Sequence, residues 1–94
     1  MNDDKERVRL ASDIVQVASR YVSLKQVGNR YKACCPFHQE KSPSFSIDSA
    51  RQTWHCFGAC QEGGDVFSFI QKAENLSFPE ALQRLADMAG IALQ

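Results

Sequence analysis

The sequence lacks a long apolar run, a secretion signal and an excess of charge of either sign. No stretch approaches the roughly 18 consecutive apolar residues that a membrane-spanning helix needs, so we expect no membrane segment. Without a secretion signal, we expect the cysteines to stay reduced and the protein to be cytoplasmic. Eleven basic residues balance eleven acidic ones, which excludes a chain that coats nucleic acid uniformly with positive charge.

The sequence does contain two short clusters of metal-ligating residues. Cys35 and His38 are separated by two residues, and Cys56 and Cys60 by three. Zinc binds thiolate and imidazole ligands in a closed tetrahedron, and three cysteines with one histidine are an ordinary structural set. Residues 39–55 are long enough for a strand, a turn and a strand that return the second cluster to the first. The spacing therefore predicts a zinc ribbon that binds one structural Zn²⁺ ion through these four residues.

Each cluster has a neighbouring residue that is an alternative ligand. Cys34 adjoins Cys35, and His55 adjoins Cys56. Side chains alternate along a strand, so Cys34 should face away from Cys35, and only Cys35 keeps the two-residue gap to His38. We therefore interpret Cys34 as a small buried hydrophobic residue and His55 as an outward-facing strand residue, in preference to metal ligands. A disulfide framework is the rival explanation of four cysteines. It explains two neighbouring clusters, each with a histidine beside it, less well than zinc does.

Periodicity and turn signals predict helices at both ends of the chain and strands between them. Apolar residues recur at helical spacing in the N-terminal segment, where Ser12-Asp13 can cap a second helix, so one long helix and two short ones are alternatives. Alternation of polar and apolar residues predicts strands at 30–34, 44–48 and 53–56.

Two further helices are expected after the second cluster. Gly63-Gly64 breaks the chain, and Asp65 can cap the first of these helices. The sequence Ser77-Phe78-Pro79-Glu80 is a capping box for the second helix, which Gly90 can close.

Together these elements predict one small α+β domain, an antiparallel zinc-ribbon sheet flanked by helices. The expected parts are a helical segment (1–24), the zinc ribbon (25–60) and C-terminal helices (64–94). Ninety-four residues form only a thin core. A bound metal would supply what this core lacks, because structural zinc contributes about 10–16 kcal/mol in small finger peptides.

Charge is unevenly distributed along the chain. Residues 23–60 contain five basic and two acidic residues, whereas residues 61–94 contain two basic and five acidic ones. Single-stranded nucleic acid is held by positive charge along its backbone and by aromatic rings under its bases. The candidate DNA contacts of the ribbon are Lys25, Arg30, Lys32, Lys41, Arg51 and Trp54. From composition alone we favour the alternative, in which the rings form the core of the ribbon and the charges a solvated surface.

The choice of Trp54 depends on where the other rings are expected. Tyr31 and Phe45 should point inward from their strands. Phe37 and Phe57 lie inside the two clusters and should pack, which leaves Trp54 as the exposed ring.

A series of linked motifs covers nearly the whole chain from Asp13 onward. The motifs are Asp13-Ile14-Val15, Tyr21-Val22-Ser23-Leu24-Lys25, Cys35-Pro36-Phe37-His38-Gln39-Glu40-Lys41-Ser42-Pro43-Ser44-Phe45-Ser46, His55-Cys56-Phe57-Gly58, Gly63-Gly64-Asp65-Val66-Phe67-Ser68-Phe69-Ile70 and Leu76-Ser77-Phe78-Pro79-Glu80-Ala81-Leu82. Together they resemble the N-terminal zinc-binding domain, a CHC2-type zinc finger, of bacterial DNA primases of the DnaG type. One departure is the second cluster, where the family usually has two residues between the cysteines and this chain has three. Zinc ligand gaps of two to four residues occur, so the departure concerns the loop and not the metal.

The resemblance implies a domain that engages single-stranded DNA template and helps to start RNA primer synthesis in DNA replication. In such primases, the chemistry belongs to a separate polymerase domain that binds catalytic metal ions through acidic residues. This chain has no such acidic cluster, so we expect no catalytic site in it. The resemblance further implies that the chain is a fragment of a primase, a nucleotidyltransferase. Its partners would be single-stranded DNA, the polymerase domain and, as a further candidate, the replicative helicase.

Two other functions stay open at this point. One is a stand-alone zinc-ribbon protein of a mobile element that binds other DNA or a protein partner. The other is a thiol redox sensor that ejects zinc on oxidation, for which a second thiol at Cys34 is the one supporting feature.

Overall fold

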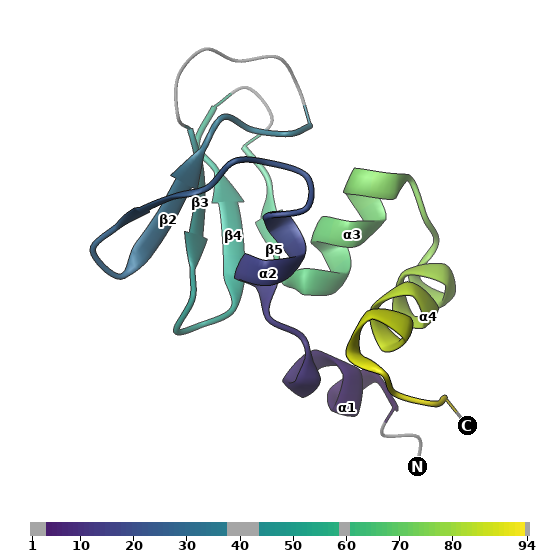
Figure 1. Cartoon of the computed structure of the whole chain (residues 1–94). Helices are drawn as coiled ribbons and strands as arrows, with labels where there is room; N and C mark the ends of the chain where they lie inside the picture. Colours follow the sequence, from purple (N-terminus) through teal and green to yellow (C-terminus); the bar gives the residue numbers. More distant parts are fainter. Residues whose placement is uncertain (1–3, 38–43, 59–60, 94) are drawn as a thin grey trace.

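The strands form one antiparallel sheet in which each strand pairs with its neighbour in the sequence (Figure 1). The structure is a computed structural model that describes residues 4–37, 44–58 and 61–93. Over these residues the elements are α1 (Asp4–Ala11), α2 (Ile14–Ala18), β1 (Lys25–Val27), β2 (Arg30–Ala33), β3 (Phe45–Asp48), β4 (Thr53–Cys56), β5 (Gly63–Gly64), α3 (Val66–Glu74) and α4 (Phe78–Ala89). The predicted α+β fold is confirmed.

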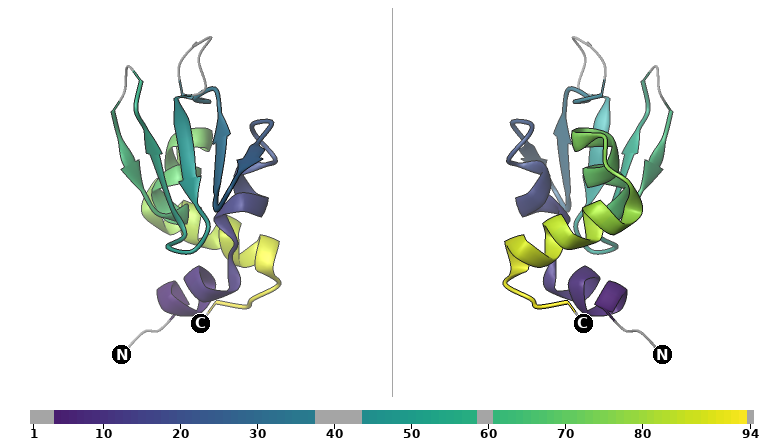
Figure 2. Two further views of the ribbon diagram at one scale, coloured as in Figure 1. Left: turned by 90° about the vertical axis from the view of Figure 1, so that its left-hand side faces the viewer. Right: turned by 90° about the vertical axis from the view of Figure 1, so that its right-hand side faces the viewer.

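One face of the sheet packs against the helices, and no described helix covers the other face. The view from the sheet side in Figure 2 shows the strands in front, and the opposite view shows α3 and α4 in front. The register pairs Tyr31 with Ile47 and Ile47 with Trp54, so these side chains share the covered face. Ile47 and Trp54 are accordingly buried. The next row, which pairs Lys32 with Ser46 and Ser46 with His55, points to the open face.

Caps at the helix ends explain where the helices begin and stop. The Asp13 side chain accepts a hydrogen bond from the Val15 N–H, which starts α2 as a second N-terminal helix separate from α1. Asp65 caps α3 through the Ser68 N–H. Gly90, at a φ of 72°, ends α4 in the left-handed conformation that glycine adopts without strain. Of the two alternatives for the N-terminal segment, the structure has two short helices.

Two short strands were not predicted from the sequence. β1 is exposed on both faces and so carries no alternating pattern. Gly63-Gly64 does not break the chain but pairs with β4 as β5. A Cβ atom on Gly63 would lie 2.7 Å from the Trp54 carbonyl oxygen. The glycine therefore permits a close backbone approach that other residues would prevent.

The capping box of α4 gives a prediction of stability. The Ser77 hydroxyl accepts the Glu80 N–H, and the Glu80 carboxylate accepts the Ser77 N–H in return. Ser77→Ala should lower the free energy of unfolding by about 1 kcal/mol, the usual effect of a lost cap. Urea denaturation of both proteins measures the difference, and an unchanged midpoint would contradict the role of this cap.

In the part of the chain described here, no helix is long and apolar enough to cross a membrane.

Candidate metal centre and open sheet face

The structure brings the two described metal-ligand candidates to one end of the sheet. Ala33 at the end of β2 is opposite Phe45, which is opposite Cys56 at the end of β4. Cys35 follows β2 by two residues, so both cysteines lie at this end. Cys35 is 4% exposed and Cys56 is fully buried. The other two predicted ligands, His38 and Cys60, lie outside the described residues.

The surroundings of Cys56 suit a thiolate that binds metal. The Ser44 Oγ lies 4.0 Å from the Cys56 Sγ, and hydroxyl groups beside a ligand commonly orient it. The backbone here is also held by two hydrogen bonds of 2.8 Å. The Cys56 N–H donates to the Glu62 carbonyl oxygen, and the Phe57 N–H donates to the Ser44 carbonyl oxygen. No disulfide joins two of the three described cysteines. The two buried thiols of Cys35 and Cys56 therefore fit half of the thiolate and imidazole donor set that zinc prefers.

The two alternative ligands both point away from this end of the core. Cys34 and His55 are exposed, whereas the adjacent Cys35 and Cys56 are buried. The predicted orientation of His55 is confirmed. Cys34 does face away from Cys35, but its predicted burial is wrong, because alternation turns it toward the face that no described helix covers.

A lysine on α3 connects the two clusters. The Lys72 Nζ lies 5.3 Å from the centre of the Phe37 ring, in the first cluster, and forms an ion pair with Glu62, just after the second. The Phe37 ring also contacts Phe45, Trp54 and Phe69, with ring centres 5.2–6.2 Å apart. Phe37 therefore packs, as predicted, and α3 supports both clusters.

The predicted DNA-contacting cations are all exposed wherever the structure describes them. Lys25 pairs with Lys32 across β1 and β2, and Arg30 lies two residues from Lys32, so the three side chains share the open face. Arg51 is 83% exposed in the turn between β3 and β4. Lys41 lies outside the described residues.

The prediction that Trp54 is an exposed ring is wrong. The residue is 2% exposed, because the register places it on the covered face beside Ile47. Its indole N–H donates to the Asp65 carbonyl oxygen at 3.0 Å and lies 3.1 Å from the Ser68 hydroxyl. A base cannot stack on a ring that the core already encloses.

An exposed aromatic pair that the sequence reasoning missed lies on the other face. Phe57 is 64% exposed, so its predicted packing role is wrong, and its ring centre lies 4.4 Å from that of the His55 ring. The period-two pattern could have found the pair, since Phe57 follows the outward-facing His55 by two residues.

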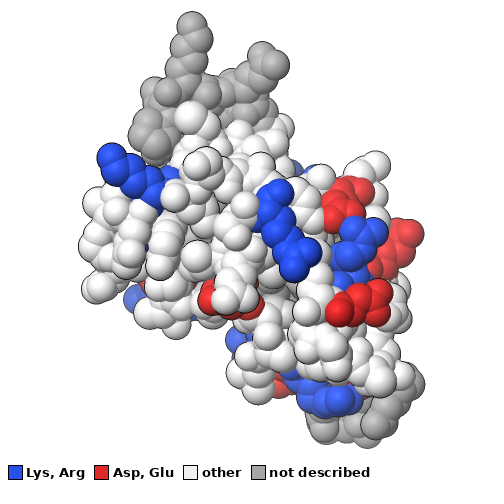
Figure 3. All heavy atoms as spheres, in the orientation of Figure 1, with Lys and Arg blue, Asp and Glu red and all other residues white. Residues whose placement is uncertain are grey.

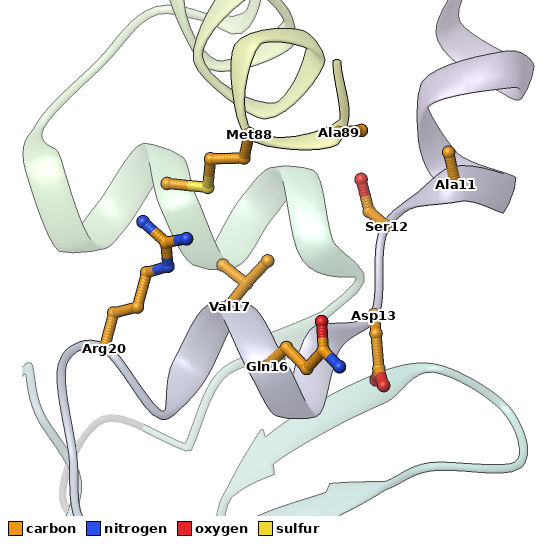
Figure 4. A pocket seen from close by; sticks show the side chains of 8 residues that line it. All are labelled: Ala11, Ser12, Asp13, Gln16, Val17, Arg20, Met88 and Ala89. Carbon is orange, nitrogen blue, oxygen red and sulfur yellow. The ribbon is translucent and has the colours of Figure 1, made fainter. Parts of the chain in front are cut away.

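The helical side of the molecule carries charges of both signs and a small cavity. In the view of Figure 3, most of the visible acidic side chains gather over the ends of α3 and α4, where basic side chains lie beside them, and basic side chains also appear over β1 and β2. A small cavity of about 70 Å³ lies between α2 and α4 (Figure 4). Its lining residues are Ala11, Ser12, Asp13, Gln16, Val17, Arg20, Met88 and Ala89. Pockets that bind small molecules usually have volumes of at least about 300 Å³, so this cavity is too small for such a ligand.

Beside this cavity, hydrogen bonds among three side chains connect the segment after α2 to α3 and α4. The Tyr21 hydroxyl donates to Glu74, which also accepts from Arg84. Burial, and then the hydrogen bond to Glu74, raise the pKa of Tyr21 to about 12. The folded protein therefore favours the neutral phenol.

This raised pKa predicts a pH-dependent contribution to stability. An unfolded tyrosine ionises near pH 10, so the contribution is complete below that pH and is lost as the pH rises through about 12. Tyr21→Phe should be less stable than wild type by about 1 kcal/mol at pH 8. The difference should shrink between pH 10 and about 12. Denaturant titrations over this range measure it, and a difference that does not change with pH would contradict the assignment.

Comparisons with known proteins give one consistent answer. The family model described as CHC2 zinc finger matches residues 2–94. The chain is 47% identical over 88 residues to a DNA primase of Enterococcus faecalis, covering 94% of this chain and 14% of that protein. It is 50% identical over 88 residues to a DNA primase of Thermotoga maritima, covering 94% of this chain and 15% of that protein.

A solved structure agrees with these sequences. The crystal structure of the Aquifex aeolicus primase, with its zinc-binding and RNA polymerase domains, matches all of this chain and 23% of that one. The TM-score is 0.92 at 39% sequence identity. The resemblance to the zinc-binding domain of DNA primases is thereby confirmed, and the chain belongs to the CHC2 zinc-finger family.

Proposed function

We propose that this chain is a template-binding domain of a DNA primase and binds single-stranded DNA on the open sheet face. The observation that carries the proposal is the gathering of Lys25, Arg30 and Lys32 on the one face of the sheet that no described helix covers. The exposed pair of Phe57 and His55 extends this face toward the metal-ligand clusters. That the matched relatives are DNA primases supports the same role.

The two kinds of side chain serve the two parts of the ligand. The cations contact phosphates, and these contacts are sensitive to salt and indifferent to sequence. The Phe57 ring offers a stacking surface for a base, a contact that adds affinity without charge. Arg51 and Lys41 are the further candidates for phosphate contacts.

The zinc ion has a structural role in this proposal. We infer that one Zn²⁺ is held by Cys35, His38, Cys56 and Cys60, which would leave no coordination position for a reactive water. Bound there, the metal would hold the end of β2, which carries Lys32, close to the end of β4, which carries His55.

The chain would act as one part of a larger protein. It spans about one seventh of the length of the primases it matches, as the 14% and 15% coverages show. We propose that it is a single domain, with segments 1–24, 25–60 and 64–94, in a primase whose polymerase domain performs the chemistry. Single-stranded DNA, that polymerase domain and the replicative helicase are its proposed partners, in the cytoplasm where bacterial DNA is copied.

Two substitutions on the open face separate charge from stacking. Lys32→Ala should weaken binding and reduce the slope of log affinity against log salt by about 0.7, the value for one phosphate contact on a single strand. Phe57→Ala should cost about 1–3 kcal/mol of binding free energy with little change in the slope. Fluorescence anisotropy of a labelled oligonucleotide at several salt concentrations measures both.

The matched control is Lys5→Ala. Lys5 is also an exposed lysine, but it lies on α1 and contacts the Phe78 ring, away from the sheet. Zinc content and the thermal midpoint of each variant exclude unfolding as a cause. If Lys32→Ala and Phe57→Ala both bind like the Lys5→Ala control, the open face is not the DNA contact.

The exposure of Cys34 favours a redox role as the second candidate function. A sensor would lose zinc in mild peroxide as thiols form disulfides, and Cys34→Ser would slow this loss. Zinc content that stays constant in peroxide would contradict it.

A further inference from the structure

We propose that Asp48 is a counter-charge on the open sheet face that limits its affinity for the phosphates of single-stranded DNA. The proposal rests on the proposed function and names how the affinity of that site is set. Within the described strands, Asp48 is the only acidic residue. It lies directly opposite Arg30 in the register and therefore on the same face as Arg30 and Lys32.

The Asp48 carboxylate is fixed by the turn that follows β3. One oxygen, Oδ1, accepts the N–H groups of Ala50 at 3.1 Å and of Arg51 at 3.2 Å. The other oxygen, Oδ2, lies 3.9 Å from the Arg30 Nη2 and 3.9 Å from the Arg51 Nε. A single negative charge thus lies between two guanidinium groups.

The two arginine side chains are much more exposed than the carboxylate, which the turn holds through two hydrogen bonds. Their side chains are 56% and 83% exposed, for Arg30 and Arg51, whereas that of Asp48 is 20% exposed. Exposed ion pairs contribute only about 0–1 kcal/mol, so a phosphate can compete for either guanidinium. Arginine also binds phosphate through two parallel hydrogen bonds, which this long pairing with Asp48 does not supply.

Two consequences follow for a phosphate backbone that crosses this end of the sheet. The phosphates must displace Asp48 from the arginines, and they then remain beside its unpaired charge. Both effects lower the affinity of a face that otherwise carries cations. Asp48 would therefore keep the attachment of template weak enough for the domain to release it.

Asp48→Asn tests the proposal because it removes the charge and keeps the turn. The asparagine retains a side-chain oxygen that can accept the Ala50 and Arg51 N–H groups. Affinity for a labelled single-stranded oligonucleotide at low salt should rise about three- to tenfold, as expected for one nearby surface charge. The salt slope should steepen by about 0.7 for each additional phosphate that the face binds.

Asp87→Asn is the matched control. It changes the net charge equally, but Asp87 lies on α4, where its carboxylate accepts a hydrogen bond from Gln83. Equal affinity of Asp48→Asn, Asp87→Asn and wild type would overturn the inference and leave the proposed function intact. Weaker binding by a folded, zinc-loaded Asp48→Asn would also overturn it. If wild type itself does not bind, the proposed function fails and the inference with it.

A second variant keeps the proposal testable if Asp48→Asn destabilises the turn. Because Asp48 already offsets Arg51, Arg51→Ala should lower the affinity less than Lys32→Ala does. Lys32 forms no ion pair with a described residue and so has no such offset. An equal or larger loss with Arg51→Ala would overturn the role of Asp48.

Discussion

Cys35→Ser is expected to abolish zinc binding and to unfold the sheet, whereas Cys34→Ser should retain both the metal and the fold. The reason is the opposite environment of the two neighbours, since Cys35 is 4% exposed at the end of the core and Cys34 is exposed. Structural zinc contributes about 10–16 kcal/mol in small finger peptides. The whole free energy of unfolding of a domain is only about 5–15 kcal/mol. A chain that loses its metal should therefore not stay folded.

Elemental analysis and circular dichroism of the two variants measure this contrast. Wild type treated with a strong chelator is the control, because it should give the same spectrum as Cys35→Ser. Loss of zinc from Cys34→Ser as complete as from Cys35→Ser would contradict the ligand assignment. A wild-type protein that contains no zinc would contradict the metal centre altogether.

The local elements could be predicted because their signals lie within a few residues of one another. The Asp65 cap of α3 and the Ser77 capping box of α4 are set by side chains that bond to backbone three residues away. Strand alternation is equally local, and it placed Cys34 and Cys35 on opposite faces, as found. Such features need no knowledge of the tertiary fold.

The assignment of faces failed where it depended on which side of the sheet the helices cover. Alternation states that Trp54 and Cys56 share a face, and Cys56 as a ligand candidate in the core should have placed Trp54 inside with it. The same pattern puts Phe57 with His55 outside. Cys34 was predicted to be buried as an apolar residue, but burial requires a covering element, and no described helix lies over that face.

The electrostatic details of the site could not be predicted from composition. Counting charges predicts a net positive charge for the ribbon. The position of Asp48 between Arg30 and Arg51, however, depends on strand register and on the turn after β3. The connection of Lys72 to both clusters likewise joins residues far apart in the sequence. Interactions of this kind arise only when the helices and the sheet have packed.

Trp54→Ala is expected to destabilise the zinc-loaded protein severely and not to act as a simple DNA-binding variant. Truncating a buried Trp costs about 3–5 kcal/mol through lost burial and the cavity that remains. The Trp54 ring packs at 5.2–6.2 Å between ring centres against Phe37, Phe45 and Phe69. Its loss also removes the indole N–H that donates to the Asp65 carbonyl oxygen at the start of α3. The sheet and α3 should therefore separate at lower denaturant concentration.

Two controls separate this effect from a role at the DNA. Trp54→Phe keeps a ring in the core but removes the N–H, so it should cost only about 1 kcal/mol. Phe57→Ala, an aromatic truncation three residues away on the open face, should change stability by less than about 0.5 kcal/mol while weakening DNA binding. Guanidinium denaturation with zinc present measures the first quantity, and oligonucleotide titration the second. A Trp54→Ala protein as stable as wild type but deficient in DNA binding would reverse the assignment. It would return base stacking to the ring that the register places inside the core.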